Sequence, residues 1–397
     1  MKIAYFTNTY PRATDTFIRL EVLGLRKRGL DVSTYSVRKS GDDHNVDDEV
    51  ISEKANTSFI LPFNAIELLL ALLKALLFNP IRFLEALKIT VKTSRPGIKG
   101  HFLQWAYFLE AVVLSNRLRK DKVEHLHNHL GDNSGTVTLI AAKLVNIPYS
   151  ISIHGPHIFF DGPNWALNEK TQHAKFISCI GHFCTSQMML YTESDYWDKF
   201  HIIRCGVDLE KYQFRSAATQ PKKLLFVGRL SNEKGLNVLL DSLATLNSDS
   251  HDITLTVLGD GPSRKDLEKQ AQDLNLHDIV IFKGFVDQPT IRNHLNDSDI
   301  FILPSFAEGI PVSLMEAMAI GVPVITTYVG GISELVVDQE TGLLCYPSDS
   351  DGLADAIKTY LNDQELLQQI VTKARQHVET EFDVDRQIDK LAALFQQ

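Results

Sequence analysis

Two glutamates eight positions apart, Glu308 and Glu316, are the residues of this chain whose types and spacing best fit a chemical role. They follow the apolar run DIFILPS, which predicts a strand, and the residues between them predict the start of a helix with Pro311 in its first turn. Ligands of open α/β sheets bind beyond the carboxyl ends of the strands, where helix N-termini offer unpaired N–H groups. The arrangement therefore directs two carboxylates and several backbone amides at one ligand, although a surface helix with two ordinary acids would show the same spacing.

Two cations upstream, Arg229 and Lys234, lie between the apolar strand run LLFVG and a helix expected to begin near Gly235. Arginine binds phosphate with a fork of N–H donors and lysine adds a point charge, so the pair fits an anion site. Two later strand runs, TLTVLGDGP and IVIFKGFV, also reach a glycine, which lets a ligand approach the backbone closely. Taken alone, the two cations would be better interpreted as a solvated basic pair.

Four charged residues of the second half, in their order and context, resemble the donor-binding half of retaining GT-B glycosyltransferases of family four. These residues are Arg229, Lys234, Glu308 and Glu316. The first half is similar to bacterial exopolysaccharide and lipopolysaccharide glycosyltransferases in the segments YPRATDTFIRLEVLGLRKRGLDV, HLHNHLGDNSG, SISIHGPHIF and IIRCGVDLEKY. The resemblance covers nearly the whole chain. It departs from the family at Thr14 and Asp15, where serine and glutamate are usual.

The resemblance implies a role for each candidate residue. Glu308 would stabilise positive charge on the transferred sugar or orient its hydroxyls, and His154 would contact that sugar as the active-site histidine. Glu316 would accept hydrogen bonds from the ribose. The expected donor-binding set is Arg229, Lys234, Glu316, Gly309, Ile310, Pro311, Gly284, Phe285 and Val286, and the acceptor-side set is Asp132, Asn133 and Thr16. Same-face attack and a covalent intermediate both remain open as routes to retention.

No metal ion or other cofactor is expected. Asp-x-Asp occurs at residues 297–299, 349–351 and 383–385, but these positions read as helix ends or as the terminal region, and the two cations can neutralise the leaving diphosphate. His127 and His129 alternate on one predicted strand and therefore share a face. Without a third ligand at a known spacing, a structural or acceptor-side role is favoured over zinc.

Strand-like and helix-like runs alternate along all 397 residues, which predicts an α/β protein with two doubly wound parallel-sheet domains. The GT-B resemblance implies that these domains face each other across a cleft. Residues 1–205 form the expected acceptor-side domain and residues 222–380 the donor domain. The polar segment 206–221 is the expected linker, and a helix at 381–397 is expected to return to the first domain, as is usual in the family.

The composition is that of a soluble globular protein, with 44% hydrophobic and 22% charged residues. The N-terminus, MKIAYFTNTY, lacks the pattern of a signal peptide, so a cytoplasmic location is expected. The four cysteines include no Cys-x-x-Cys pair, which favours reduced core thiols over a metal or redox site.

Charge is divided unevenly: residues 1–205 carry 24 Lys and Arg against 20 Asp and Glu, and residues 206–397 carry 16 against 29. The basic excess gathers at residues 67–122, with 10 basic and 4 acidic side chains. No basic tract is interleaved with aromatic residues and the pI is acidic, so nucleic acid is excluded as the expected partner.

The leucine-rich segment 59–92 overlaps this basic region. Glu67, Lys74 and Asn79 interrupt it before about 20 apolar residues accumulate, so it predicts amphipathic helices rather than a membrane span. These helices are expected to pack on their own sheet; peripheral contact with an anionic membrane, at the inner face of the cytoplasmic membrane, is the alternative.

The resemblance and the charged residues together predict a retaining glycosyltransferase. Its partners would be a nucleotide-diphosphate sugar and a glycan, lipid-linked glycan or related acceptor, in cell-surface polysaccharide biosynthesis. A sugar-nucleotide epimerase of the same fold and a non-catalytic nucleotide-sugar-binding protein are the alternatives. The epimerase would consume donor without an acceptor, and the intact charged set argues against a protein that has lost catalysis.

Overall fold

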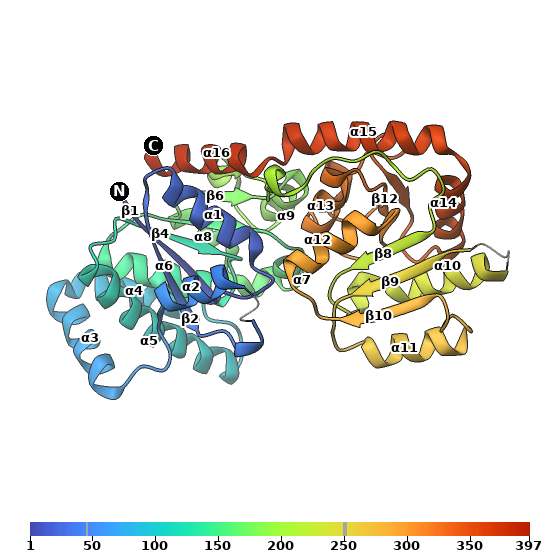
Figure 1. The fold of residues 1–397 in the computed structure, drawn as a ribbon. Helices are drawn as coiled ribbons and strands as arrows, with labels where there is room; N and C mark the ends of the chain where they lie inside the picture. Colours follow the sequence, from blue (N-terminus) through green and yellow to red (C-terminus); the bar gives the residue numbers. More distant parts are fainter. Residues whose placement is uncertain (45–46, 249–251) are drawn as a thin grey trace. The chain divides into compact units, whose positions relative to one another are not determined.

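The computed structural model describes residues 1–44, 47–248 and 252–397. The chain falls into two compact units, the first made of Met1–Ile203 with Ile388–Gln397 and the second of Arg204–Gln387 (Figure 1). Each unit contains one parallel β-sheet with helices packed on it. The predicted α/β class, with two doubly wound parallel sheets, is therefore confirmed.

The first unit contains a seven-stranded sheet in the order β3-β2-β1-β4-β5-β6-β7. Its strands are β1 (Lys2–Thr9), β2 (Asp31–Arg38), β3 (Ser58–Phe59), β4 (His125–His129), β5 (Tyr149–Ile153), β6 (Phe176–Cys179) and β7 (Phe200–Ile202). Its helices are α1 (Thr16–Lys27), α2 (Asp48–Asn56), α3 (Ala65–Phe78), α4 (Pro80–Lys92), α5 (Ile98–Lys120), α6 (Asn133–Val145), α7 (His157–Phe160), α8 (Leu167–His173), α9 (His182–Leu190) and α16 (Val384–Gln396). Strands β4, β5 and β6 are buried along their whole length, as parallel strands covered on both faces are.

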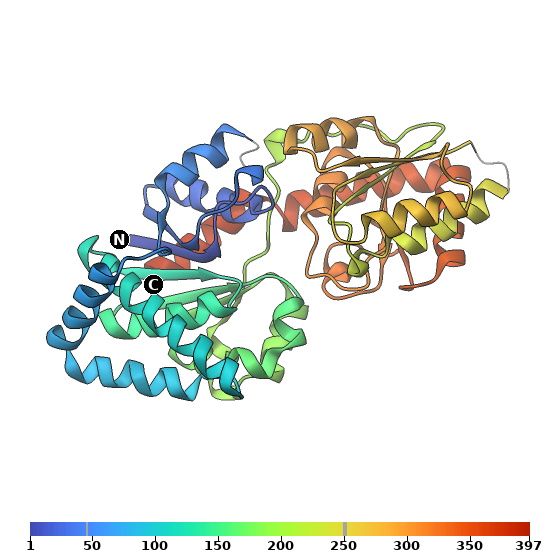
Figure 2. The ribbon, with the colours of Figure 1, turned by 90° about the horizontal axis from the view of Figure 1, so that it is seen from below.

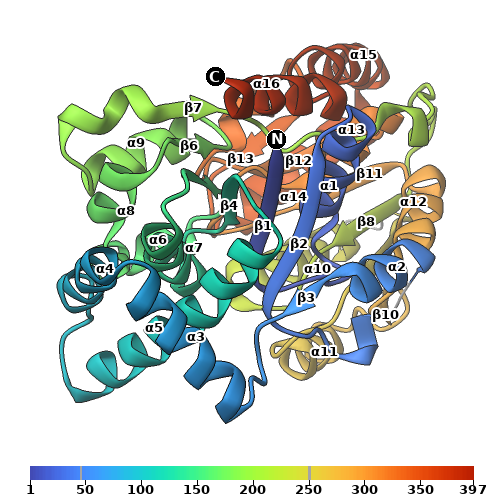
Figure 3. The ribbon, with the colours of Figure 1, turned by 90° about the vertical axis from the view of Figure 1, so that its left-hand side faces the viewer.

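Helices α1 and α16 lie side by side in the first unit (Figure 3). A β-carbon at Gly24 of α1 would come within 2.3 Å of the Ile388 side chain, so glycine permits this close packing. Phe395 of α16 packs against the rings of His127 and Phe176. Helix α16 therefore covers the sheet face that carries the histidines of β4.

The second unit contains a six-stranded sheet in the order β10-β9-β8-β11-β12-β13. Its strands are β8 (Lys223–Val227), β9 (Thr254–Leu258), β10 (Val280–Gly284), β11 (Ile300–Leu303), β12 (Val324–Thr327) and β13 (Leu343–Cys345). Its helices are α10 (Leu236–Ser248), α11 (Arg264–Asp273), α12 (Gln288–Asp297), α13 (Val312–Ile320), α14 (Ser350–Asn362) and α15 (Gln364–Glu381). In both sheets the strand order reverses once, between β1 and β4 in the first and between β8 and β11 in the second.

The segment 206–221, expected to be a linker, groups with the second unit. Tyr212 and Ala217 are buried, and the Arg215 N–H donates to the Ile320 carbonyl at 2.7 Å. These contacts hold the segment to its unit, which its polar composition did not indicate. The expected C-terminal helix is α16, and its residues from Ile388 onward group with the first unit.

The leucine-rich segment folds as two separate helices at the outer edge of the first unit (Figure 2). Asn79 ends α3 and caps α4, because its side chain accepts the Arg82 N–H at 3.1 Å. Pro80 then occupies the first position of α4, where its missing N–H costs nothing. Within the ranges that the structure describes, no helix has the length and apolarity needed to cross a bilayer.

Candidate functional site

Ligands of open α/β sheets bind in the crevice expected beyond the carboxyl ends of the strands where the strand order reverses, and in the second unit this reversal lies between β8 and β11. A backbone hydrogen bond joins the loops after these two strands, from the Phe306 N–H to the Glu233 carbonyl at 2.7 Å. Gly235 has φ +64°, and a β-carbon there would lie 2.0 Å from the Pro304 carbonyl oxygen. Only glycine allows the loops to approach so closely.

Lys234 and Glu308 form an ion pair between these loops. The lysine Nζ donates to Glu308 Oε1 at 2.6 Å, and the Ser305 hydroxyl donates to the same oxygen at 2.7 Å. The two charged side chains are only 21% and 10% exposed. A carboxylate with two donors has a fixed position, so the pair presents one anionic and one cationic group at the crevice in a defined geometry.

The loop after β12 packs against the backbone of the loop that carries Glu308. A β-carbon at Gly330 would lie 1.9 Å from the Glu308 carbonyl oxygen, and the Gly331 N–H donates to the Gly309 carbonyl at 3.0 Å. The Thr327 hydroxyl donates to the Ser305 carbonyl at 2.5 Å. Gly330 and Gly331 are thus required by backbone packing on the Glu308 loop.

The cations at the end of β8 create a local field that favours anions. Arg229 is exposed and has no side-chain hydrogen bond or ion pair within the described part of the chain. Although burial acts to raise the pKa of Glu233, the Ser231 hydroxyl, its own backbone N–H and the charges of Lys234 and Arg229 together lower it. The two cations therefore add to the stabilisation of negative charge here, after the hydrogen bonds from Ser231 and the backbone.

The glycines that end the neighbouring strands pack against one another. Gly259 has φ +136°, a β-carbon there would lie 1.9 Å from the Gly228 carbonyl oxygen, and its N–H donates to the Gly284 carbonyl at 2.8 Å. Backbone contact between strand ends therefore explains Gly259 without a ligand. Beyond Gly284, Phe285 is 51% exposed and Val286 is partly exposed, so both remain accessible to a ligand.

Glu316 lies in different surroundings from Glu308. Helix α13 begins at Val312, so Pro311 is its N-cap and not the first-turn residue that was predicted, and Glu316 lies about one turn inside the helix. The Tyr212 hydroxyl donates to Glu316 Oε1 at 2.7 Å. Burial raises the pKa of Glu316 to about 7, against the lowering effects of Tyr212 and Arg292. The proposed contact of Glu316 with ribose stays a prediction.

The acceptor-side candidates lie where the strand order reverses in the first unit. Thr16 begins α1 after the β1 loop, and Asn133 begins α6 after the β4 loop. Asp132 caps α6 through the Ser134 N–H at 2.9 Å. Arg12 and Asp15, also in the first loop, form a forked pair whose shortest contact is 2.8 Å. The structure thus places all three predicted residues at this reversal.

Lys170 supports this region and was missed by the sequence analysis. It is 1% exposed, and its Nζ donates to the carbonyls of Gly131 at 2.7 Å and Asp132 at 2.8 Å. Burial lowers the pKa of Lys170 to about 7, with Asp132 opposing the shift and Arg95 adding to it. A lysine in the polar run NEKTQH has no sequence signal of burial, so only the tertiary structure reveals it.

His154 follows β5, and its Nε2 lies 2.8 Å from Nδ1 of His129. Burial, with repulsion from His129 and His157, holds the pKa of His154 well below its ordinary value. The Phe17 ring packs on His154 with centroids 4.6 Å apart. His154 is therefore a neutral, oriented imidazole.

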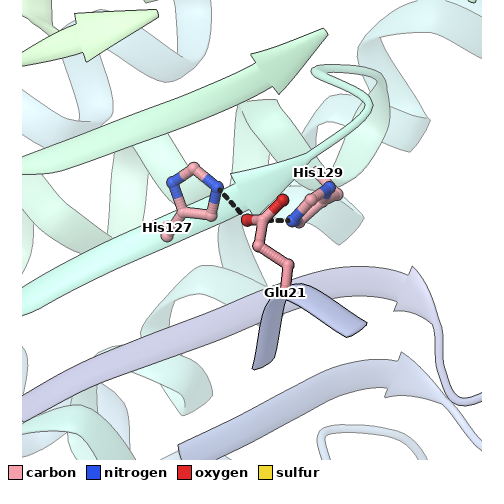
Figure 4. Close-up of side chains that lie close together, drawn as sticks. All are labelled: Glu21, His127 and His129. Atoms are coloured by element: carbon pink, nitrogen blue, oxygen red, sulfur yellow. Dashed lines mark ion pairs between the residues drawn. The ribbon is translucent and has the colours of Figure 1, made fainter. Parts of the chain in front are cut away.

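Glu21 of α1 completes a cluster with His127 and His129 (Figure 4). Its Oε1 lies 3.6 Å from His127 Nε2 and 3.2 Å from His129 Nε2. The cluster is the one place in the described residues where three potential metal ligands gather. The sequence held one signal for Glu21. Ile18 and Leu25, three positions before it and four positions after it, are buried residues of α1, so Glu21 lies on the buried face of that helix.

This cluster fits a metal ion poorly. The Tyr5 hydroxyl already donates to Glu21 Oε1 at 2.5 Å, and the two ring nitrogens of His127 lie 2.7 Å from Ser150 and 3.0 Å from Ser152.

The Asp-x-Asp segments make structural contacts. The side chains of Asp299, Asp349 and Asp383 accept hydrogen bonds from backbone N–H groups at 2.8 to 2.9 Å.

Comparison with known proteins shows what the second unit is similar to. Residues 208–377 match the family model described as glycosyl transferases group 1. The putative colanic acid biosynthesis glycosyltransferase WcaL of Salmonella typhimurium is 26% identical over 436 residues, covering all of both chains. The amylovoran biosynthesis glycosyltransferase AmsK of Erwinia amylovora is 35% identical over 194 residues, covering 47% of this chain and 48% of AmsK. The crystal structure of Anabaena HepE in complex with UDP has a TM-score of 0.75 at 17% identity over the whole of both chains. The fold is thus the GT-B fold.

Proposed function

We propose that the chain is a retaining glycosyltransferase that moves a sugar from a nucleotide diphosphate to a glycan or lipid-linked acceptor, because residues 208–377 match the family model of glycosyl transferases group 1. The names of WcaL and AmsK support a role in cell-surface polysaccharide biosynthesis. The UDP complex of HepE makes a UDP-sugar the first donor to test.

The observation that carries this proposal is the Lys234–Glu308 ion pair at the crevice between β8 and β11. Sugar transfer from a diphosphate needs positive groups at the departing phosphates and a negative group near the sugar carbon that becomes positive. Lys234 and Arg229 supply the first requirement without a metal ion, and Glu308 supplies the second. In this proposal the diphosphate competes with Glu308 for the Lys234 amine.

The other candidate site residues contact the remaining parts of the donor and the acceptor. Glu316 accepts hydrogen bonds from the ribose, and Gly284, Phe285 and Val286 hold the base. Gly309, Ile310 and Pro311 line the phosphate and sugar. In the first unit, His154 contacts the transferred sugar and Asp132, Asn133 and Thr16 contact the acceptor.

A panel of nucleotide sugars, assayed with EDTA and with a membrane glycolipid fraction, tests the proposal. Acceptor-dependent release of nucleoside diphosphate is the expected result. Conversion of the donor without an acceptor would instead identify the epimerase, and thermal stabilisation by a nucleotide sugar without turnover would identify the binding protein.

A large apolar surface on the first unit supports an acceptor at a membrane. Helix α3 buries Ala71 and Ala75 and exposes five of its seven leucines, the reverse of an ordinary surface helix. We call the exposed apolar side chains of α3, α4 and α5 the leucine face. It consists of Ile66, Leu69, Leu70, Leu73, Leu76, Leu77, Phe78, Ile81, Leu84, Val91, Ile98, Phe102 and Trp105, exposed by 44% to 92%.

We propose that the leucine face inserts into an anionic bilayer at the inner face of the cytoplasmic membrane. Exposed Lys74, Lys88 and Lys99 border it and complement anionic lipid. Full burial of one large apolar side chain contributes about 1.5–3 kcal/mol, against about 1 kcal/mol for each such lysine. Binding should therefore survive high salt. Lys92 and Arg95 are engaged within the unit, by Glu169 and by Asp161, and contribute less.

A further inference from the structure

Glu110 of α5 is a buried carboxylate of the first unit that the fold leaves without a partner. Its side chain is 6% exposed, and neither carboxylate oxygen has a hydrogen bond or ion pair within residues 1–44, 47–248 and 252–397. Other buried carboxylates of this unit are paired, Glu53 with Arg26 and Glu169 with Lys92. Burial of an unpaired carboxylate costs free energy, so native proteins rarely keep one that has only a structural role.

Helix α5 places Glu110 level with the carboxyl ends of the strands. At the C-terminus of α5, Asp121 accepts a hydrogen bond from the hydroxyl of Tyr35 in β2 at 2.7 Å. Three residues further along β2, Arg38 ends the strand, and its charge acts on Glu110. Helix α5 therefore runs antiparallel to the sheet. Its 23 residues span about 34 Å, against about 17 Å for the five residues of β4, so its N-terminal half extends beyond the strand ends.

One face of α5 continues from the core into this space. Residues three, four and seven positions apart share a helix face, so Leu103, Ala106 and Tyr107 line up with Glu110. Val113, the next residue of this face toward the C-terminus, is fully buried, whereas the three residues before Glu110 are partly exposed. Glu110 therefore lies at the base of a half-exposed surface beyond the strand ends.

Charged groups from three other segments surround Tyr107. Burial raises its pKa, and charges of Arg95 before α5, Asp132 after β4 and Arg38 at the end of β2 act on it. Asp132 follows β4, where the strand order of the first unit reverses, so Tyr107 and Glu110 border the predicted acceptor side. Sequence reasoning did not select either residue.

The side chains of this surface fit a sugar. The Tyr107 ring offers an apolar face for the C–H groups of a sugar ring, and Glu110 offers oxygens to its hydroxyls. Arg38 and Arg95 disfavour a cationic ligand here, and an ionised Glu110 disfavours an anionic one. A neutral hydroxyl group is therefore the partner that Glu110 binds best.

We propose that Glu110 and Tyr107 form a subsite for a sugar ring of the acceptor, with the ring packed on Tyr107 and a hydroxyl bound by Glu110. That this sugar belongs to the acceptor rests on the proposed function. The subsite itself rests on the unpaired carboxylate and the half-exposed face of α5. A sugar lacking this hydroxyl would leave Glu110 unpaired and would be rejected, so the subsite also gives specificity.

The melting temperature of full-length Glu110→Met at pH 8 is the first test. Burial raises the pKa of Glu110 to about 7, so at pH 8 the wild-type carboxylate is ionised without a partner. A residue kept for a ligand costs stability, so the variant should melt at the same temperature as wild type or higher. The matched control Glu169→Met removes a carboxylate that is 8% exposed but paired with Lys92, and it should melt lower. A lower melting temperature of Glu110→Met would overturn the proposal.

Saturation-transfer NMR with the methyl glycosides of glucose, galactose, mannose and fucose is the second test. Wild type should bind at least one of them, and Glu110→Met should bind it about 10- to 100-fold more weakly, the loss expected for a hydrogen bond to a charged group. Tyr107→Ala should also weaken binding, and Glu169→Met should bind as wild type. A wild type that binds none of these sugars, or equal binding by wild type and Glu110→Met, would overturn the subsite.

Transfer assays separate the subsite from the proposed function. With a membrane glycan fraction as acceptor, Glu110→Met should raise the acceptor KM about 10- to 100-fold and keep the donor KM. Transfer with an unchanged acceptor KM would overturn the subsite and leave the transferase standing. Sugar binding that depends on Glu110, without transfer to any acceptor, would support the sugar subsite and refute the proposed function.

Discussion

Replacing Glu308 by glutamine should separate nucleotide binding from transfer. Lys234 Nζ and the Ser305 hydroxyl both donate to Glu308 Oε1, and an amide oxygen can accept both bonds in the same place. The substitution therefore removes charge with little change of shape. Turnover should fall 10²- to 10³-fold, the usual cost of about 2.7–4 kcal/mol for losing one electrostatic partner of the transition state. Nucleoside diphosphate should bind more tightly.

The gain in affinity follows from Coulomb's law. A carboxylate about 8 Å from a phosphate charge repels it by about 2 kcal/mol at an effective dielectric constant of about 20. Lys234 is 21% exposed and Glu308 10%, so solvent screening reduces this to about 1 kcal/mol, or about 5-fold in the dissociation constant. The neutral amide also frees the Lys234 amine for the phosphate.

Calorimetric titration with UDP in EDTA, together with steady-state turnover, measures both effects. Glu233→Gln is the control for turnover, because it removes one negative charge from the neighbouring loop and leaves both hydrogen bonds of Glu308 in place. The control should keep wild-type turnover. A weaker affinity for UDP in Glu308→Gln, or unchanged turnover, would refute the assignment of Glu308 to the reacting sugar and of Lys234 to the diphosphate.

Three further outcomes are expected. Lys234→Ala should weaken UDP binding by about 1.5–3 kcal/mol in calorimetry, equally with and without EDTA; abolition of wild-type activity by EDTA would contradict the metal-free site. Burial raises the pKa of Glu316 to about 7, above its ordinary 4.5. The protonated side chain therefore stabilises the fold by about 3 kcal/mol below pH 4.5, and this stability is lost as the pH rises through 7. Chemical denaturation at pH 4.5 and 8 should show a loss about 3 kcal/mol larger in wild type than in Glu316→Gln, because Glu110, whose pKa burial also raises to about 7, titrates in both proteins. Wild type should co-sediment with anionic vesicles at high salt, whereas the double variant Leu77→Gln with Phe102→Gln should not. The control Leu190→Gln changes an exposed leucine outside the leucine face and should behave as wild type. Protein that stays in the supernatant under every condition would refute insertion.

The strands were predictable because buried parallel strands are continuous apolar runs, which are visible in a single sequence. The predicted runs DIFILPS and IVIFKGFV contain β11 and β10, and the glutamate pair of the second unit follows the strand that the sequence placed before it. Element ends were less accurate. Proline is common at the first helical position, yet Pro311 precedes the helix, and the expected linker is anchored by the buried Tyr212.

Contacts between distant elements could not be predicted. The partners of Glu308 and Glu316, namely Lys234 and Tyr212, lie 74 and 104 positions away, and no spacing rule connects them. Glu21 reaches the β4 histidines only because β1, β4 and α1 come together in the fold. Its place on the buried face of α1 was the one available signal.

Transfer of labelled sugar from a nucleotide sugar to a membrane glycan fraction, measured side by side for wild type and Glu308→Gln, tests the central claim most directly. The account predicts acceptor-dependent incorporation by wild type in EDTA and almost none by Glu308→Gln, although the variant still binds UDP. Equal incorporation by both proteins, or a wild type that binds no nucleoside diphosphate, would contradict it.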